Sequence, residues 1–205
     1  MAEFRWFGST CVRIRGKDAS VLTDPFGGAA FGKQTADVIT LSHDADIDAT
    51  KGDAAVLRGP GEYEVRGLFV TGVRTYRDEQ KAAGRGHNTV YLIEIDGLTV
   101  CHLGHLGHTL TTEQAEAMAS VDVLLVPAGS ASLDPAKAAE VVAQIEPKLV
   151  IPLHDRETPG DGALGAVEAF VKELGLEAPE PEEKLSLRAG DLGETTRLAI
   201  LRPSH

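Results

Sequence analysis

The sequence predicts an α/β protein built as a four-layer αββα sandwich, in which two β-sheets pack face to face and helices cover their outer faces. Short strand-like segments joined by hairpin turns fill the first half of the chain, whereas strands alternate with helices in the second half. Single histidines follow three of the strands, at His43, His105 and His154. This combination favours helices flanking sheets over an all-β barrel, and we expect residues 1–205 to form one domain.

The first half of the chain alternates short apolar or β-branched runs with glycine-containing turns, a pattern typical of hairpins. Gly59-Pro60-Gly61 and Asp96-Gly97 are two such turns. The polar segment Tyr76–His87 separates two of the runs and is expected to be an exposed loop. The strands predicted here are Arg5–Phe7, Cys11–Arg15, Val21–Thr23, Val38–Leu41, Ala54–Arg58, Tyr63–Val65, Leu68–Val73, Thr89–Ile95 and Leu98–His102.

Helix signals appear from residue 111 onward. Thr111 and Gln114 form a capping-box pattern for a short helix. Asp134-Pro135 supplies an N-cap and a first-turn proline for a second helix, and Gly162–Leu174 is a third amphipathic segment. The apolar positions of the second helix are Ala138, Val141, Val142 and Ile145. The strands predicted between and after the helices are Val121–Pro127, Leu149–Leu153, Leu185–Arg188 and Arg197–Leu201.

The excess of acidic over basic residues makes polyanionic partners unfavourable. A formal net charge of −11 disfavours nucleic acids and anionic membrane surfaces, unless a local basic cleft counteracts it. No segment reaches the roughly 18 apolar residues of a membrane span, and the N-terminus lacks the apolar region of a signal peptide. Cys11 and Cys101 lie in strand-like runs and fit a reducing compartment. We therefore expect a cytoplasmic protein that binds a small molecule, as a monomer or a homo-oligomer.

Histidines at strand ends predict a metal site. Ligand sites of open α/β sheets collect beyond the carboxyl ends of strands, so His43, His105 and His154 can converge there although they are far apart in sequence. Neutral imidazoles that meet a carboxylate suit zinc or a similar divalent ion. His102 and His108 share a three-residue spacing with His105, but the glycines between them favour a loop over a helical face. We expect His102 to pack in the sheet and His108 to bond near the following helix.

Seven segments between residues 4 and 155 together resemble a known family. They are RWFGSTCVRI, TDPF, VITLSHD, LRGPGEYEV, NTVYLIEIDGLTVCHLGHLGH, VDVLLVPAG and AAEVVAQIEPKLVIPLH. In combination they resemble the metallo-β-lactamase superfamily, specifically its small bacterial branch of metal-dependent hydrolases related to lactonase-like enzymes. The resemblance implies the αββα fold and one or two metal ions that activate water.

The ligand-bearing positions depart from the pattern of that family. Where the family has H-x-H-x-D-H, residues 43–48 read HDADID, and Ala45 and Ile47 have no donor atom. The aspartate of the family's HLGDLGH pattern, which commonly bridges two metals, is replaced by His105. A single imidazole nitrogen cannot span two ions as a carboxylate does, so a dinuclear site is not expected. The histidine of IPLH is kept as His154.

The resemblance and its departures together imply a remodelled, at most mononuclear site. The candidate metal ligands are His43, Asp48, His105 and His154. Zinc suits them best, and His43 and Asp48 are also the candidate catalytic residues. If three of the four bind and water completes the coordination, the protein hydrolyses an ester, a lactone or a phosphoester. If all four bind, the site is closed and structural.

A non-catalytic descendant of the family is the alternative. In that case the protein keeps the sandwich as a binding or assembly module and holds no metal. Arg77 stands near the position where the family's next histidine falls, and arginine cannot ligate a cation. Without an ion, Arg77 supplies the missing positive charge and pairs with Asp44 or Asp48.

Overall fold

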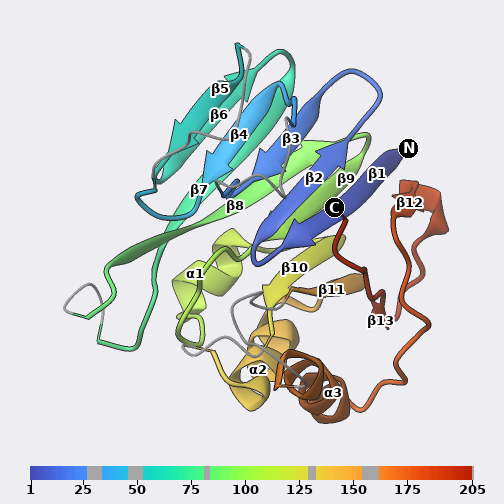
Figure 1. Cartoon of the computed structure of the whole chain (residues 1–205). Coiled ribbons are helices and arrows are strands. Elements are labelled where there is room, and N and C mark those ends of the chain that lie inside the picture. Colours follow the sequence, from blue (N-terminus) through green and yellow to red (C-terminus); the bar gives the residue numbers. More distant parts are fainter. Residues whose placement is uncertain (27–33, 46–52, 81–83, 129–132, 154–161, 205) are drawn as a thin grey trace.

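Two mixed β-sheets packed face to face form the centre of the molecule (Figure 1). The computed structural model describes residues 1–26, 34–45, 53–80, 84–128, 133–153 and 162–204, with the backbone alone for 162–164. Small and large apolar side chains from both sheets fill the space between them, among them Phe4, Trp6, Tyr91 and Ile151. These residues alternate along their strands with residues that face outward, as expected for sheets with one face on a shared core.

The first sheet has six strands in the order β12-β1-β2-β3-β4-β5. β1, β2 and β3 form the expected antiparallel meander, but β4 pairs in parallel with both β3 and β5. The carboxyl ends of β3 and β4 therefore lie side by side. The bounds are β1 Ala2–Gly8, β2 Cys11–Arg15, β3 Ser20–Thr23, β4 Val38–Leu41, β5 Ala55–Arg58 and β12 Leu185–Leu187.

The second sheet has seven strands in the order β13-β11-β10-β9-β8-β7-β6. Strands β6 to β9 are antiparallel, and β9, β10, β11 and β13 run parallel. The β7–β8 hairpin is longer than predicted because its pairing continues to Tyr76 opposite His87. The bounds are β6 Gly61–Val65, β7 Leu68–Tyr76, β8 His87–Ile95, β9 Leu98–His102, β10 Val123–Pro127, β11 Leu149–Leu153 and β13 Arg197–Leu198.

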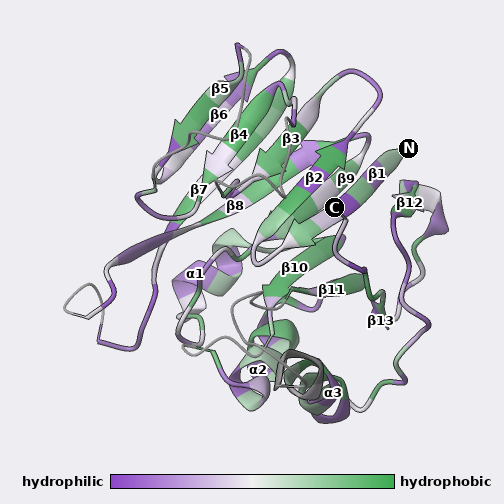
Figure 2. Ribbon diagram, viewed as in Figure 1, coloured by the Kyte–Doolittle hydropathy of each residue, from purple (hydrophilic) through white to green (hydrophobic). Residues whose placement is uncertain are grey.

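The helices are α1 (Thr112–Ala117), α2 (Pro135–Ile145), α3 (Gly162–Leu174) and a 3₁₀ turn at Ala189–Asp191. All three α-helices lie on the same side of the sandwich, next to β10 and β11 in Figure 1. The predicted stripe of α2 is buried there with outward-facing residues of the seven-stranded sheet. Figure 2 shows that apolar residues are concentrated along the central strands and polar residues at the outer end of β8.

The sequence signals for the helix ends are confirmed. Thr111 and Gln114 form the reciprocal hydrogen bonds of a capping box at α1, and the Asp134 side chain caps α2 ahead of its first-turn proline. The two packed sheets of the expected sandwich are confirmed as well. None of the helices in the described ranges is long and apolar enough to cross a membrane.

The outer face of the six-stranded sheet has its own apolar cluster. The described ranges place no α-helix on this face, where a separate cluster of five buried apolar residues lies. Its members are Phe7, Cys11, Leu22, Ile39 and Leu41. Phe26, Ala36 and Ala54 pack against them, so short connecting segments cover this sheet where the structure is described.

Candidate metal centre at the rim of the sandwich

Hydrogen bonds join the two sheets where the ends of β3 and β4 approach β8. The Thr89 backbone N–H, at the start of β8, donates to the Ser42 carbonyl at 2.7 Å. The buried Tyr91 hydroxyl donates to the Leu41 carbonyl at 3.0 Å. Asp24 directly follows β3, and Ser42 and His43 directly follow β4, so side chains of both strand ends reach this rim.

Asp24 is a buried carboxylate that ties the ends of β3 and β4 together. Its Oδ1 accepts the Ser42 backbone N–H at 2.6 Å, and its Oδ2 accepts the Ser42 hydroxyl at 2.6 Å and the Thr10 hydroxyl at 3.0 Å. Only 3% of the Asp24 side chain is exposed. Three donors compensate the desolvation of this carboxylate, as a buried charge requires.

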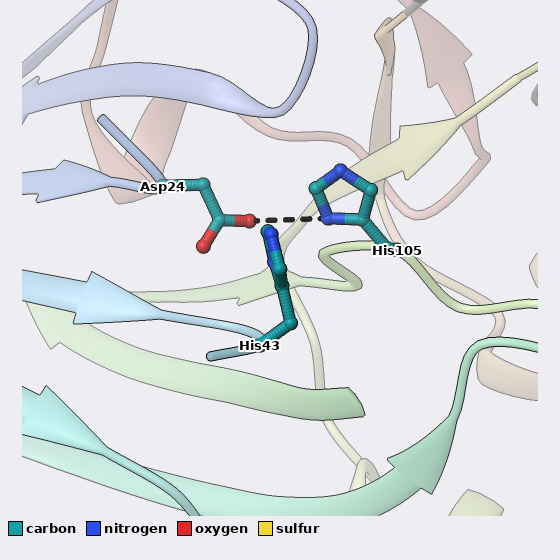
Figure 3. Close-up of side chains that lie close together, drawn as sticks. All are labelled: Asp24, His43 and His105. Atoms are coloured by element: carbon teal, nitrogen blue, oxygen red, sulfur yellow. Dashed lines mark ion pairs between the residues drawn. The ribbon is translucent and has the colours of Figure 1, made fainter. Parts of the chain in front are cut away.

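His43 and His105 face this carboxylate (Figure 3). The His105 Nδ1 lies 3.7 Å from the Asp24 Oδ2, and the two imidazole rings meet edge to face with centroids 4.4 Å apart. The Ser42 Oγ is 3.2 Å from the Nδ1 atoms of both histidines. One potential ligand atom from each of Asp24, His43 and His105 lies within 4.8 Å of the other two.

The electrostatics keep these groups in the forms that bind cations. Burial alone would raise the pKa of Asp24, but the nearby His105 and His102 imidazoles and the Ser42 hydrogen bond outweigh it and hold that pKa well below its usual range. Burial lowers the pKa of His43, and His105 and Arg77 act in the same direction. Near pH 7 the cluster therefore offers an anionic carboxylate and, at His43, a neutral imidazole with a free lone pair.

The geometry fits a small divalent ion. An ion with bonds of about 2.1 Å in tetrahedral array places its donor atoms about 3.4 Å apart. The 3.7 Å between Asp24 and His105 is close to that spacing, and all three potential ligand atoms lie within 4.8 Å of one another. Within the described ranges the cluster offers three donors, and a site with three protein ligands leaves a fourth position for water or substrate, as in catalytic rather than structural zinc sites.

The loop after β9 reaches the site because a glycine lets it approach β4. Gly104 has a φ of +59°, and a Cβ at this position would lie 2.3 Å from the Ser42 Cβ. The buried Asn88 side chain fixes the same loop by donating to the Leu103 carbonyl at 3.0 Å and accepting the His105 N–H at 2.8 Å. Gly104, the first glycine of HLGHLGH, therefore allows His105 to lie beside Asp24.

We expect Gly104→Ala to destabilise the protein by about 3 kcal/mol or more, because left-handed strain adds to overpacking against Ser42. Gly97→Ala is the matched control, since Gly97 also has positive φ (+78°) but has no neighbour within 4 Å of its Cβ position. Strain alone should cost that variant about 1–2 kcal/mol. Urea unfolding of both variants measures the difference, and equal losses would contradict the close approach.

The structure brings together half of the ligand set predicted from sequence. His43 and His105 meet as expected, whereas Asp48 and His154 lie outside the described residues, so their roles as ligands and the catalytic role of Asp48 stay predictions. Asp24 was not among the predicted ligands. Its position at a strand end was visible in the sequence, but its place beside Ser42 depends on the parallel pairing of β3 with β4.

The predicted pairing of Arg77 with Asp44 is not found among the described residues. The ion pair of Asp44 is instead with Arg58, at 3.7 Å. The Arg77 backbone is held on the hairpin, where its N–H donates to the Gly86 carbonyl at 3.1 Å, and its Nε is buried without a hydrogen-bond partner. The positive charge of Arg77 helps to lower the pKa of the His43 imidazole, for which burial is the largest cause.

The two remaining histidines of the motif have structural roles. His102 is fully buried in the sheet, as predicted, and its Nε2 donates to the Thr10 carbonyl at 2.9 Å. His108 accepts the Tyr76 N–H at Nε2 and donates from Nδ1 to the Thr109 carbonyl, so it bonds to the β7–β8 hairpin and to the segment before α1. Neither is part of the cluster of Asp24, His43 and His105.

Comparisons with known proteins agree with this architecture. A family model for the beta-lactamase superfamily domain matches residues 3–154. A candidate Zn-dependent hydrolase of the metallo-beta-lactamase superfamily from Thermotoga maritima is 31% identical, with 98% of each chain covered and a TM-score of 0.82. A search among curated proteins gave no match.

More distant structures share the fold alone. A possible metal-dependent hydrolase from Veillonella parvula DSM 2008 is 14% identical over 91% of this chain and 100% of its own, with a TM-score of 0.68. A candidate metal-dependent hydrolase from Parabacteroides distasonis ATCC 8503 is 16% identical over 98% and 94% of the two chains, with a TM-score of 0.65. With the family model spanning most of the sequence and the site at the expected rim, the chain belongs to the metallo-β-lactamase superfamily.

Proposed function

We propose that this protein is a hydrolase that holds a single divalent ion, zinc, on Asp24, His43 and His105, and that it acts on an ester, a lactone or a phosphoester of a small molecule. The observation that carries the proposal is the convergence of one anionic carboxylate and two imidazoles at an open rim. The name of the Thermotoga maritima relative, which describes a Zn-dependent hydrolase, supports the same chemistry.

Each residue has a separate task in this proposal. Asp24 supplies the negative charge, and its bonds from Ser42 and Thr10 fix the direction of its oxygens. His43 and His105 supply imidazole donors, and the Asn88 side chain holds the His105 backbone. When bound, the ion would lower the pKa of a water molecule and polarise the scissile group. His154 and Asp48 stay predicted as further ligands or as a base.

The number of ions follows from the residues at hand. Ala45 and Ile47 offer no donor for a second ion, and an imidazole at position 105 cannot bridge two ions. We therefore propose a mononuclear centre. We also propose a cytoplasmic location, which the free, buried thiols of Cys11 and Cys101 support.

Elemental analysis of protein purified without added metal tests the proposal. We expect about one equivalent of a divalent ion, most of it zinc, and hydrolysis of chromogenic esters or phosphodiesters that a chelator abolishes and zinc restores. Circular dichroism before and after chelation shows whether the fold survives. Less than about a tenth of an equivalent of any divalent metal, together with no turnover after zinc is added, would overturn it.

A binding module without catalysis is the second candidate, and one observation favours it. The Ser42 hydroxyl donates to Asp24 and lies within hydrogen-bonding distance of both histidines, so the cluster can satisfy its own hydrogen bonds without an ion. In that case the chelated protein would be as stable as the untreated one and neither would turn over any substrate. A clear rise in melting temperature on zinc binding, together with zinc-dependent turnover, excludes it.

A further inference from the structure

A cavity of about 310 Å³ opens beside the candidate metal centre, and its lining differs in charge from the rest of the chain. It lies between the two sheets, bounded by the end of β4, the turn after β5, and the adjoining ends of β7 and β8. His43 belongs both to this lining and to the cluster with Asp24 and His105. A ligand in the cavity would therefore reach the candidate metal centre.

Two arginines and two histidines face this cavity, against a single acidic residue. They are Arg58, Arg74, His43 and His87, with Asp44 as the acid. With histidine counted as neutral, the lining carries two positive charges against one negative charge, whereas the chain as a whole has a formal net charge of −11. The cavity volume is near the lower end of the roughly 300–1,000 Å³ typical of small-ligand pockets. A cavity of this size can enclose a small molecule but is too small to enclose a polymer.

The guanidinium of Arg58 is available to a ligand. Its Nη1 lies 3.7 Å from the Asp44 carboxylate, which is fully exposed, and 3.3 Å from the Ala45 carbonyl. Ion pairs between exposed groups contribute little in water, so an anion in the cavity can compete for this guanidinium. Arg58 also has donors to spare, because a guanidinium carries five N–H groups.

Arg74 is held in place by its backbone while its charge stays uncompensated. The Gln114 amide of α1 donates to the Arg74 carbonyl at 2.9 Å, and the residue pairs with Thr89 in the β7–β8 ladder. Over the part of the chain that the structure describes, its side chain has no carboxylate partner. A fixed backbone with an uncompensated guanidinium is well suited to bind an oxyanion.

We propose that Arg58 and Arg74 bind an anionic group of the substrate, a carboxylate or a phosphate, and so direct the proposed hydrolase to small anionic esters and lactones. The inference rests on the proposed function for the reaction and on the cavity for the specificity. Both arginines line the same cavity as His43, so an anionic group held by them and a bond to be cleaved beside His43 can belong to one small molecule. The substrate is thus a bifunctional molecule with an oxyanion at one end and an ester, lactone or phosphoester bond at the other.

Oxyanion binding is tested first without metal, so that the result does not depend on catalysis. The chelated full-length protein is titrated with inorganic phosphate and, separately, with succinate, by isothermal titration calorimetry. We expect saturable binding of at least one of them, weakened about tenfold or more by Arg58→Gln and by Arg74→Gln. Tighter binding of phosphate identifies a phosphate-bearing substrate, and tighter binding of succinate a carboxylate-bearing one.

Arg15→Gln is the matched control, because it removes the same charge from an exposed position at the opposite end of β2 from the rim. It should leave anion binding unchanged. The inference is overturned if neither anion binds saturably, or if Arg15→Gln weakens binding as much as Arg74→Gln does.

A second measurement separates the inference from the proposed function. Zinc-loaded protein is assayed with p-nitrophenyl acetate, with the mono-p-nitrophenyl ester of succinate, and with p-nitrophenyl esters of phosphate. We expect kcat/KM to be about tenfold higher for the carboxylate ester than for the neutral one, with the advantage lost in Arg74→Gln through a higher KM. Anion binding without turnover contradicts the hydrolase but supports the cavity. Turnover without preference for an anionic ester supports the hydrolase and overturns the inference.

Discussion

Replacing Asp24 by alanine is expected to lower the free energy of unfolding by about 3–5 kcal/mol, one of the largest effects of a single substitution in this chain. The change leaves three buried donors without an acceptor, namely the Ser42 N–H, the Ser42 hydroxyl and the Thr10 hydroxyl. It also opens the junction between the ends of β3 and β4. Urea unfolding followed by circular dichroism measures the loss, and the tryptophan fluorescence of Trp6 gives an independent probe.

Asp37→Ala is the matched control for this prediction. Asp37 lies at the opposite end of the same two strands and accepts the Ser20 N–H at 2.9 Å and the Ser20 hydroxyl at 2.8 Å, as Asp24 does with Ser42. Its side chain is 28% exposed, against 3% for Asp24, so water can replace the lost acceptor. We expect a loss of about 1 kcal/mol. Similar losses in both variants would show that burial at Asp24 is not the cause.

His105→Ala is expected to weaken binding of a divalent ion by at least about a hundredfold and to abolish hydrolysis, because it removes one of three protein donors. His105→Asp should bind one equivalent, since a carboxylate oxygen can take the place of the imidazole nitrogen. It should not bind two, because Ala45 and Ile47 still offer no donors. Competition with a chromogenic chelator gives the affinity, and elemental analysis gives the number of ions.

The control for the His105 variants is His87→Ala. His87 lines the cavity beside the cluster but lies outside the group of Asp24, His43 and His105. This variant should keep its metal content while losing some of its affinity for substrate. If His105→Ala binds zinc as tightly as the unchanged protein, the proposed ligand set is wrong.

Local signals were enough to predict most elements of the fold. The strand β4 and the helix α2 have the bounds expected from apolar runs, the Asp134 cap and the proline after it. The β7–β8 hairpin was predicted too short, because Arg74 to Tyr76 and His87 to Asn88 are polar or mixed in pattern. Their ladder continues through cross-strand pairing, which hydropathy along one strand does not reveal.

The site was only half predictable for a similar reason. His43 and His105 could be found because each follows a strand and belongs to a recognisable motif. The role of Asp24 depends on which strands are neighbours, and the parallel pairing of β3 and β4 is a contact between segments that no local turn joins. Arg58 and Arg74 lie on strands of different sheets, so only the packing of the two sheets brings them to one cavity.

The hydrogen bond from Thr89 to Ser42 has a consequence for how the protein matures. It joins the two sheets beside the cluster, and His105 is 63 residues from Ser42 along the chain. Contacts between residues so far apart in sequence form late in folding, because closing a large loop costs chain entropy before the contact can stabilise the fold. A metal ion therefore has no assembled set of these ligands to bind in the unfolded chain. An ion bound as proposed would be acquired after folding and would stabilise the finished fold by mass action, unlike the ion of a zinc finger, whose binding drives folding.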